Sequence, residues 1–86
     1  MRVTFTEIAW QQYLDWLQED KKTIKRINTL IKDITRNGPM NGIGKPEALK
    51  YQKAYSRRID EANRLVYFID SDGELVIQHC KGHYEE

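Results

Sequence analysis

"RLVYFIDSDGELVIQHC", residues 64–80, is the stretch of sequence that decides the fold. It opens with a strongly apolar run from Arg64 to Ile69, and it closes with apolar and polar residues that alternate from Glu74 to Cys80. The "DSDG" between them has the composition of a tight turn. Two runs of this kind joined by a turn predict a β-hairpin.

The chain immediately before this hairpin predicts a further strand and a loop. Residues 54–59 form a short, more polar run that we expect to pair with the hairpin. Residues 37–47, "NGPMNGIGKPE", are rich in glycine and proline, which interrupt regular structure. No low-complexity tract or repeat accompanies them, so we interpret this segment as a loop within one domain.

Two helices are predicted upstream of the loop. In the first, Trp10, Tyr13, Leu14 and Leu17 recur at helical spacing and are expected to form the buried stripe, with Trp16 off the stripe, either half exposed or covered by the second helix. The apolar face of the second helix is expected to consist of Ile24, Ile27, Leu30, Ile31 and Ile34.

Capping residues mark the ends of these helices. Thr6 and Asp20 are suitable N-caps, and Asn37-Gly38-Pro39 is a suitable stop. Val3 and Phe5 alternate with polar residues, which predicts a short strand before the first helix. The order β-α-α-β-β-β predicts a single α+β domain, residues 1–86, with two N-terminal helices packed on a twisted antiparallel sheet.

Composition excludes several classes of protein. No apolar run approaches the roughly 20 residues that a membrane span requires, and the N-terminus lacks the apolar core of a secretory signal. The only cysteine, Cys80, cannot form an internal disulfide, which suits a reducing cytoplasm. We therefore expect a cytoplasmic protein with no membrane partner.

The formal net charge is only +1, but basic residues concentrate in two segments, residues 21–36 and 44–64. Basic surfaces of this kind are compatible with binding to a polyanion, because local phosphate contacts matter more than total charge. They are equally typical of solvated helix faces, and charge alone leaves both interpretations open.

Three side-chain types suggest a particular chemistry. Glu47 follows the basic loop, Arg64 begins the apolar strand, and His83 comes three residues before the end of the chain. A carboxylate, an arginine and an imidazole are the groups needed for in-line RNA cleavage, in which a base, an electrostatic stabiliser and an acid cooperate. Taken alone, Glu47 could equally pair with a neighbouring lysine, and His83 could be a solvated tail residue.

The order of several motifs along the chain favours the catalytic interpretation of these residues. "DKKTIKRINTLIKDI" (20–34), "GKPEALK" (44–50), "SRRI" (56–59), "NRLVY" (63–67) and "HY" (83–84) together resemble the YoeB/Txe branch of the RelE/ParE toxin superfamily over essentially the whole chain. The resemblance implies a cytoplasmic bacterial toxin of a type II toxin–antitoxin system. It further implies a ribosome-dependent endoribonuclease that cuts mRNA in the A site of the 70S ribosome and needs no cofactor.

The resemblance also implies roles for residues. Glu47 would be the general base, Arg64 the transition-state stabiliser, His83 the general acid and Tyr84 a residue that orients or stacks on the substrate. Cations facing the RNA phosphates would be Lys45, Lys50, Arg57 and Arg58. Contacts to ribosomal RNA would come from Lys21, Lys22, Lys25, Arg26 and Lys32.

Partners follow from the same resemblance. A Phd/YefM-type antitoxin would neutralise the toxin by covering its site, and operator DNA would be contacted only through the toxin–antitoxin complex. Relatives commonly dimerise, so a homodimer is possible.

Three alternatives compete with the nuclease interpretation. A ParE-like gyrase inhibitor on the same fold would need neither acid nor base. A non-catalytic RNA-binding module would use the basic helix and stack bases on Tyr51, Tyr55 or Tyr84. A metal site at His79, Cys80 and His83 would lack a fourth ligand, and in a strand the first two point to opposite faces, so no metal is expected.

Overall fold

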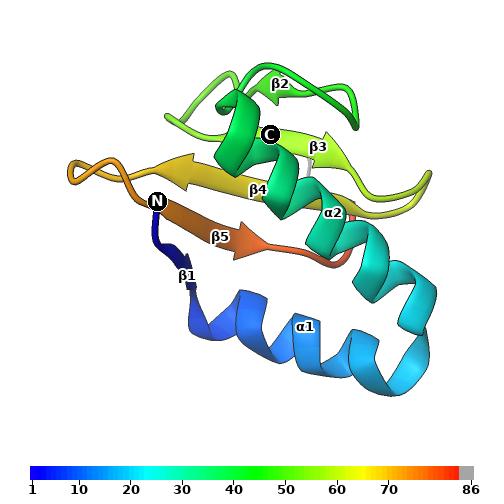
Figure 1. The fold of residues 1–86 in the computed structure, drawn as a ribbon. Coiled ribbons are helices and arrows are strands. Elements are labelled where there is room, and N and C mark those ends of the chain that lie inside the picture. Colours follow the sequence, from blue (N-terminus) through cyan, green and yellow to red (C-terminus); the bar gives the residue numbers. More distant parts are fainter. Residues whose placement is uncertain (84–86) are drawn as a thin grey trace.

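The computed structural model describes residues 1–83 as two helices packed on a five-stranded sheet (Figure 1). The elements are β1 (Val3–Phe5), α1 (Glu7–Glu19), α2 (Lys21–Asn37), β2 (Glu47–Ala48), β3 (Tyr55–Arg58), β4 (Arg64–Ile69) and β5 (Leu75–His79). The predicted α+β class and the predicted order are confirmed. The additional strand β2 forms at the end of the segment that was expected to be a loop.

The sheet has the strand order β1-β5-β4-β3-β2, and its strands β2 to β5 are antiparallel. At the other edge β1 runs parallel to β5, with Val3 opposite Leu75 and Phe5 opposite Ile77. The sheet is therefore mixed rather than wholly antiparallel as predicted. Alternation along β1 specifies which side chains are buried but not the direction of the partner strand, which lies about 70 residues further along the chain.

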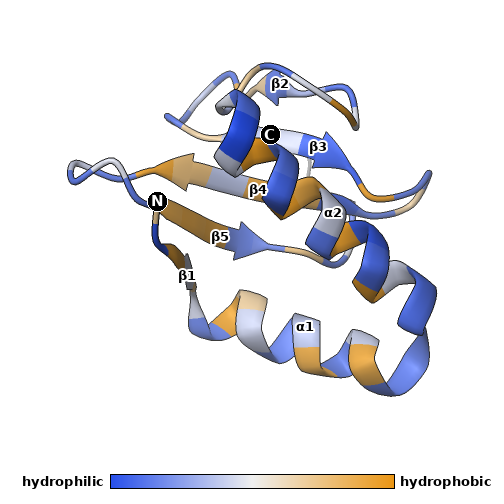
Figure 2. Cartoon of the chain, viewed as in Figure 1, coloured by the Kyte–Doolittle hydropathy of each residue, from blue (hydrophilic) through white to orange (hydrophobic). Residues whose placement is uncertain are grey.

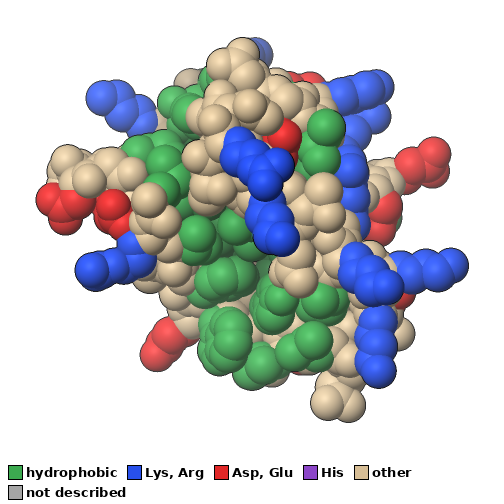
Figure 3. Space-filling view, viewed as in Figure 1, with side chains coloured by type: hydrophobic (Ala, Val, Ile, Leu, Met, Phe, Trp, Pro, Cys, Tyr) green, Lys and Arg blue, Asp and Glu red, His purple; other side chains and the backbone are tan. Residues whose placement is uncertain are grey.

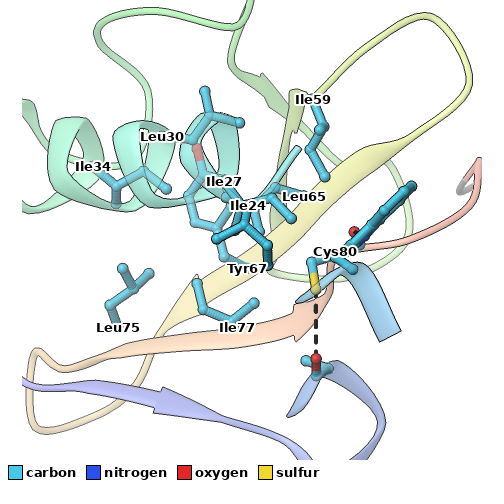
Figure 4. Packing of buried hydrophobic residues seen from close by; sticks show 12 residues of the cluster. Ile24, Ile27, Leu30, Ile34, Ile59, Leu65, Tyr67, Leu75, Ile77 and Cys80 are labelled. Carbon is cyan, nitrogen blue, oxygen red and sulfur yellow. Dashed lines mark hydrogen bonds between the residues drawn. The ribbon is translucent and has the colours of Figure 1, made fainter. Parts of the chain in front are cut away.

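The core lies between α2 and the sheet (Figure 4). Ile24, Ile27, Leu30 and Ile34 of α2 are buried, as predicted, and Ile31 packs at the edge of the same cluster. They meet Leu65 and Tyr67 of β4 and Leu75 and Ile77 of β5, all fully buried. Figure 2 shows the same pattern as a hydrophobic band along β4 beneath α2. Burial of each such aliphatic side chain stabilises the fold by roughly 1.5–3 kcal/mol.

The predicted helix caps are confirmed. Thr6 Oγ1 accepts a hydrogen bond from the N–H of Ala9 at 3.1 Å, and Asp20 Oδ1 accepts one from the N–H of Lys22 at 3.0 Å. The N–H of Asp20 also donates to the carbonyl of Trp16 at 2.8 Å, so one residue ends α1 and begins α2. Gly38 ends α2 with a φ of 88°, a conformation that favours glycine.

The predicted buried stripe of α1 is wrong at two of its four residues; the other two, Tyr13 and Leu14, are half-buried. Trp10 is 50% exposed and Leu17 is 42% exposed, whereas Trp16 is only 8% exposed. The indole Nε1 of Trp16 donates to the carbonyl of Cys80 at 2.8 Å, and the ammonium of Lys81 lies 4.9 Å from its ring centroid. Because α1 packs against β5 and the segment after it, the side of α1 that holds Trp16 faces the core.

The other side of α1 borders an apolar groove of about 550 Å³ between β1, α1 and α2. Val3, Phe5, Trp10, Tyr13 and Ile31 supply its apolar lining. Figure 3 shows hydrophobic side chains gathered over this region, with Lys and Arg side chains over α2 beside it. No helix within residues 1–83 is long and apolar enough to cross a membrane.

Candidate active site

The sheet face opposite the helices carries the polar residues of the candidate site. In β4, Leu65 and Tyr67 point into the core, so the alternation of a strand sends Arg64 to the other face. Arg64 is paired with Arg58 of β3, and Glu47 of β2 is paired with Ser56. Directly opposed residues share a face of the sheet, which brings these side chains to one side.

A cleft of about 280 Å³ opens on this face. Its lining comes from β2, β3, β4 and the end of the chain: Glu47, Ala48, Leu49, Lys50, Ser56, Arg64 and His83. Within it, Arg64 Nη1 lies 3.9 Å from Glu47 Oε2 and donates to Ser56 Oγ at 3.5 Å. The Arg64 side chain is 16% exposed and that of Glu47 is 59% exposed, so the cation is enclosed while the carboxylate reaches solvent.

The segment after β5 carries His83 to the cleft. The N–H of Arg64 donates to the carbonyl of Gly82 at 3.0 Å, and the N–H of Gly82 donates to Asn63 Oδ1 at 2.7 Å. Gly82 has a φ of 90°, where a side chain would be strained. His83 also lines an adjacent cleft of about 220 Å³ with Arg64, His79 and Lys81. The prediction for Tyr84 lies outside the described residues.

The other predicted cations occupy different positions. Lys50 lines the cleft, whereas Lys45 and Arg58 are exposed and do not line it. On α2, Arg26 is half-buried and donates to the carbonyl of Arg58 at 3.2 Å. The remaining cations of that set are exposed, namely Lys21, Lys22, Lys25 and Lys32.

Arg57 contradicts its predicted role as a phosphate contact. Its side chain is fully buried, and Nη1 lies 2.5 Å from Asp33 Oδ2. The other donors are also engaged: Nε donates to the hydroxyl of Tyr67, Nη1 to the carbonyl of Ile43, and Nη2 to two further carbonyls of the loop, those of Gly38 and Asn41. Because a strand alternates, the neighbours Arg57 and Arg58 face opposite sides, and Arg57 faces α2.

This buried cluster shifts the ionisation of its members. Hydrogen bonding from the Arg57 guanidinium, together with the N–H of Ile43, holds the pKa of Asp33 below its usual range. Burial raises the pKa of the Tyr67 hydroxyl, which also donates to the carbonyl of Pro39 at 2.5 Å. The cluster therefore ties the loop to α2 and β3, and the loop leads directly into Glu47.

Sequence reasoning missed Ser56 and Asn63. Ser56 is 2% exposed and lies in the cleft against Arg64. The sequence did hold a signal for Ser56. Because side chains alternate along a strand, Ser56 and Arg58 lie on one face of the sheet and Arg57 lies on the other. Asn63 accepts a hydrogen bond from the N–H of Gly82, a contact between distant parts of the chain for which the sequence holds no local signal.

Within residues 1–83, no group of three His, Cys, Asp or Glu side chains is arranged to hold a metal ion. Cys80 is fully buried, and its Sγ donates to the carbonyl of Ala9 at 3.5 Å. Burial raises the pKa of the Cys80 thiol to about 12. A thiol in this state is a core residue rather than a thiolate ligand.

The fold is that of bacterial toxins with known structures. A YoeB chain from a heterotetrameric YoeB–YefM toxin–antitoxin complex of Staphylococcus aureus superposes with a TM-score of 0.89 at 48% identity, over 98% of each chain. A YoeB dimer from the same organism gives a TM-score of 0.91 at 48% identity, again over 98% of each chain. These similarities define the class as a toxin of a type II toxin–antitoxin system.

Sequence comparison identifies the family. The model for the YoeB-like toxin of bacterial type II toxin–antitoxin systems matches residues 5–84. A Toxin YoeB from Synechocystis is 51% identical over 99% of both chains. The chain belongs to the YoeB-like toxin family.

Proposed function

We propose that this toxin is a ribosome-dependent endoribonuclease that cuts mRNA in the A site and thereby inhibits translation. The observation that supports the proposal is that Glu47, Arg64 and His83, which lie far apart in the sequence, line one cleft. These are the three groups that metal-independent cleavage of RNA requires.

The reaction follows from the chemistry of the three groups. The Glu47 carboxylate takes the proton of the ribose 2′-hydroxyl, and O2′ attacks the adjacent phosphorus. Arg64 donates to the phosphoryl oxygens as negative charge develops on them. The P–O5′ bond then breaks, and the imidazolium of His83 gives its proton to O5′, leaving a 2′,3′-cyclic phosphate and a 5′-hydroxyl. General acid–base groups of this kind contribute roughly 10²–10⁴-fold each.

The state of Arg64 suits this role. Its guanidinium makes one long contact to Glu47, at 3.9 Å, and one to Ser56, at 3.5 Å. Both contacts are weak by hydrogen-bond criteria, so a phosphate in the cleft can replace them at little cost. Arginine also stays charged at any working pH and offers two parallel donors to a phosphate.

Other cations extend the proposed interface with RNA. Lys50 lines the cleft, and Lys45 and Arg58 lie exposed outside it. We expect these three cations to contact the phosphates that flank the scissile bond. Tyr84 would orient or stack on the substrate. The exposed lysines of α2, with Arg26, would contact ribosomal RNA.

The proposed partners are a YefM-type antitoxin and a second copy of the toxin. The support is that structures of S. aureus YoeB are known both in a heterotetrameric complex with YefM and as a dimer. The antitoxin would restrain the toxin in the bacterial cytoplasm by covering the cleft, and operator DNA would be bound through the complex.

Primer extension on an mRNA under translation by 70S ribosomes tests the proposal, with the wild-type protein beside His83→Gln. We expect cleavage within the A-site codon for the wild type and a large loss for the variant. Equal cleavage by both proteins would refute the role of His83. Inhibition of gyrase on supercoiled DNA without any cleavage of mRNA would favour the ParE-like alternative instead.

A further inference from the structure

His83 lines the cleft although it belongs to no helix or strand, so its position depends on the backbone contacts of its own segment. Gly82, immediately before it, is held at both of its backbone polar groups. Its carbonyl accepts from the N–H of Arg64 at 3.0 Å, and its N–H donates to the side-chain oxygen of Asn63 at 2.7 Å.

The Asn63 amide is itself oriented by Asp60. Asn63 Nδ2 donates to both carboxylate oxygens of Asp60, at 3.0 and 3.1 Å. An ionised carboxylate only accepts hydrogen bonds, so the NH₂ end of the amide must face it. The oxygen end of the amide is thereby directed at the N–H of Gly82. Asp60 is fixed in turn by the N–H groups of Ala62 and Asn63, at 2.8 and 2.7 Å.

We infer that Asn63 is a positioning residue that holds the His83 imidazole in the cleft, and that Asp60 sets the direction in which the Asn63 amide points. The inference rests on the proposed nuclease function for its catalytic consequence. Asn63 does not line the cleft and does not touch the substrate; it acts through Gly82.

The backbone contacts of Gly82 connect the position of the proposed acid to that of the proposed cation. Asn63 and Arg64 are neighbours in the chain, and both hold Gly82, so the backbone that carries the proposed cation also locates the proposed acid. A displacement of a catalytic group by about 1 Å can cost ~10²-fold in rate. Loss of the Asn63 contact should therefore lower turnover and leave ribosome affinity unchanged.

Three variants of the full-length toxin isolate this contact. Asn63→Leu keeps the shape of the side chain and removes the acceptor. The exchanged pair Asp60→Asn with Asn63→Asp reverses the donor and acceptor between the two side chains but keeps an oxygen for Gly82, and it should restore function. Glu61→Gln alters the same turn at an exposed residue and is the control.

Hydrogen exchange of the Gly82 amide, followed by NMR, tests the anchor without any RNA. We expect exchange about tenfold faster in Asn63→Leu, the factor that corresponds to one hydrogen bond, and wild-type exchange in the exchanged pair and in Glu61→Gln. Unchanged exchange in Asn63→Leu would overturn the inference. Hydrogen exchange tests the anchor whether or not the wild-type toxin cuts mRNA. If the anchor is present and the wild-type toxin does not cut mRNA, only the nuclease proposal fails.

Single-turnover cleavage on ribosomes, at saturating toxin, tests the catalytic consequence. Asn63→Leu should slow cleavage ~10- to 10²-fold, and the exchanged pair should recover most of that loss. In a His83→Gln background, Asn63→Leu should have no further effect, because the residue acts only through His83. An equal loss in both backgrounds would show that Asn63 does not act through His83 and would refute the inference.

Discussion

Arg64 Nη1 and Glu47 Oε2 lie 3.9 Å apart across the cleft, one group enclosed and the other open to solvent. A pair this long and this exposed contributes little to stability. The ion pair therefore adds little to the stability of the fold, which leaves both groups available for the chemistry proposed above.

Glu47→Gln should lower mRNA cleavage by roughly 10²–10⁴-fold, because an amide cannot take the proton of the 2′-hydroxyl. The thermal midpoint of unfolding should stay near that of the wild type, since the side chain is 59% exposed. Cleavage rates from primer extension, together with thermal unfolding curves, provide the check, and the exposed Glu61→Gln is the control. Cleavage by Glu47→Gln at the wild-type rate would exclude Glu47 as the base.

Arg57→Met should destabilise the fold by about 3 kcal/mol or more, because it removes all the guanidinium hydrogen bonds to Asp33 and to the loop carbonyls at once. Arg58→Met, at the next position of the same strand, is exposed and should change stability by no more than ~0.5 kcal/mol. Urea unfolding of both variants measures the difference. Similar losses for the two would contradict the buried role of Arg57.

Gly42→Ala should destabilise the toxin more than Gly38→Ala does. Both glycines have positive φ, which costs an alanine about 1–2 kcal/mol. A Cβ at Gly38 would meet open space, whereas one at Gly42 would lie 1.8 Å from Asp33 Oδ2 and force the carboxylate away from Arg57. The comparison of unfolding free energies separates backbone strain from disruption of the ion pair. Equal losses of unfolding free energy in the two variants would mean that the Arg57–Asp33 ion pair tolerates displacement of the carboxylate.

Stability should decline at alkaline pH, in part through Cys80. Its pKa is raised from 9.0 to about 12 by burial, so the folded state disfavours the thiolate. The stabilisation from the neutral thiol is complete below pH 9 and is lost as the pH rises from 9 towards 12. Urea unfolding between pH 7 and 11 should give a shallower alkaline decline for Cys80→Ala than for the wild type. An equally steep loss of stability in the two proteins would contradict the assignment of part of the alkaline decline to Cys80.

Much of the fold could be predicted because local patterns specify it. The β4–β5 hairpin, the apolar face of α2 and the caps at Thr6 and Asp20 all follow from spacing or from side-chain chemistry within a few residues. The face of α1 could not be predicted in this way. Apolar residues lie on several sides of that helix, and the choice of Trp16 over Trp10 depends on the Cys80 carbonyl, which comes from the far end of the chain.

The residues of the candidate site likewise include some that local sequence motifs predicted and others that they did not. Glu47, Arg64 and His83 were predicted from motifs, and they line one cleft. Arg57 was misplaced because its motif was considered without the alternation of the strand that contains it. The parallel pairing of β1 and the contact of Asn63 with Gly82 join segments that only the folded chain brings together.

The pairing of β1 with β5 also bears on the kinetics of folding. Val3 and Leu75 are opposite one another but lie about 70 residues apart in the chain. Contacts between positions this distant in sequence carry a large cost in loop-closure entropy and slow the folding of a domain. The hairpin of β4 and β5, in contrast, joins strands that follow one another directly. It can therefore form early and provide the edge to which β1 is added.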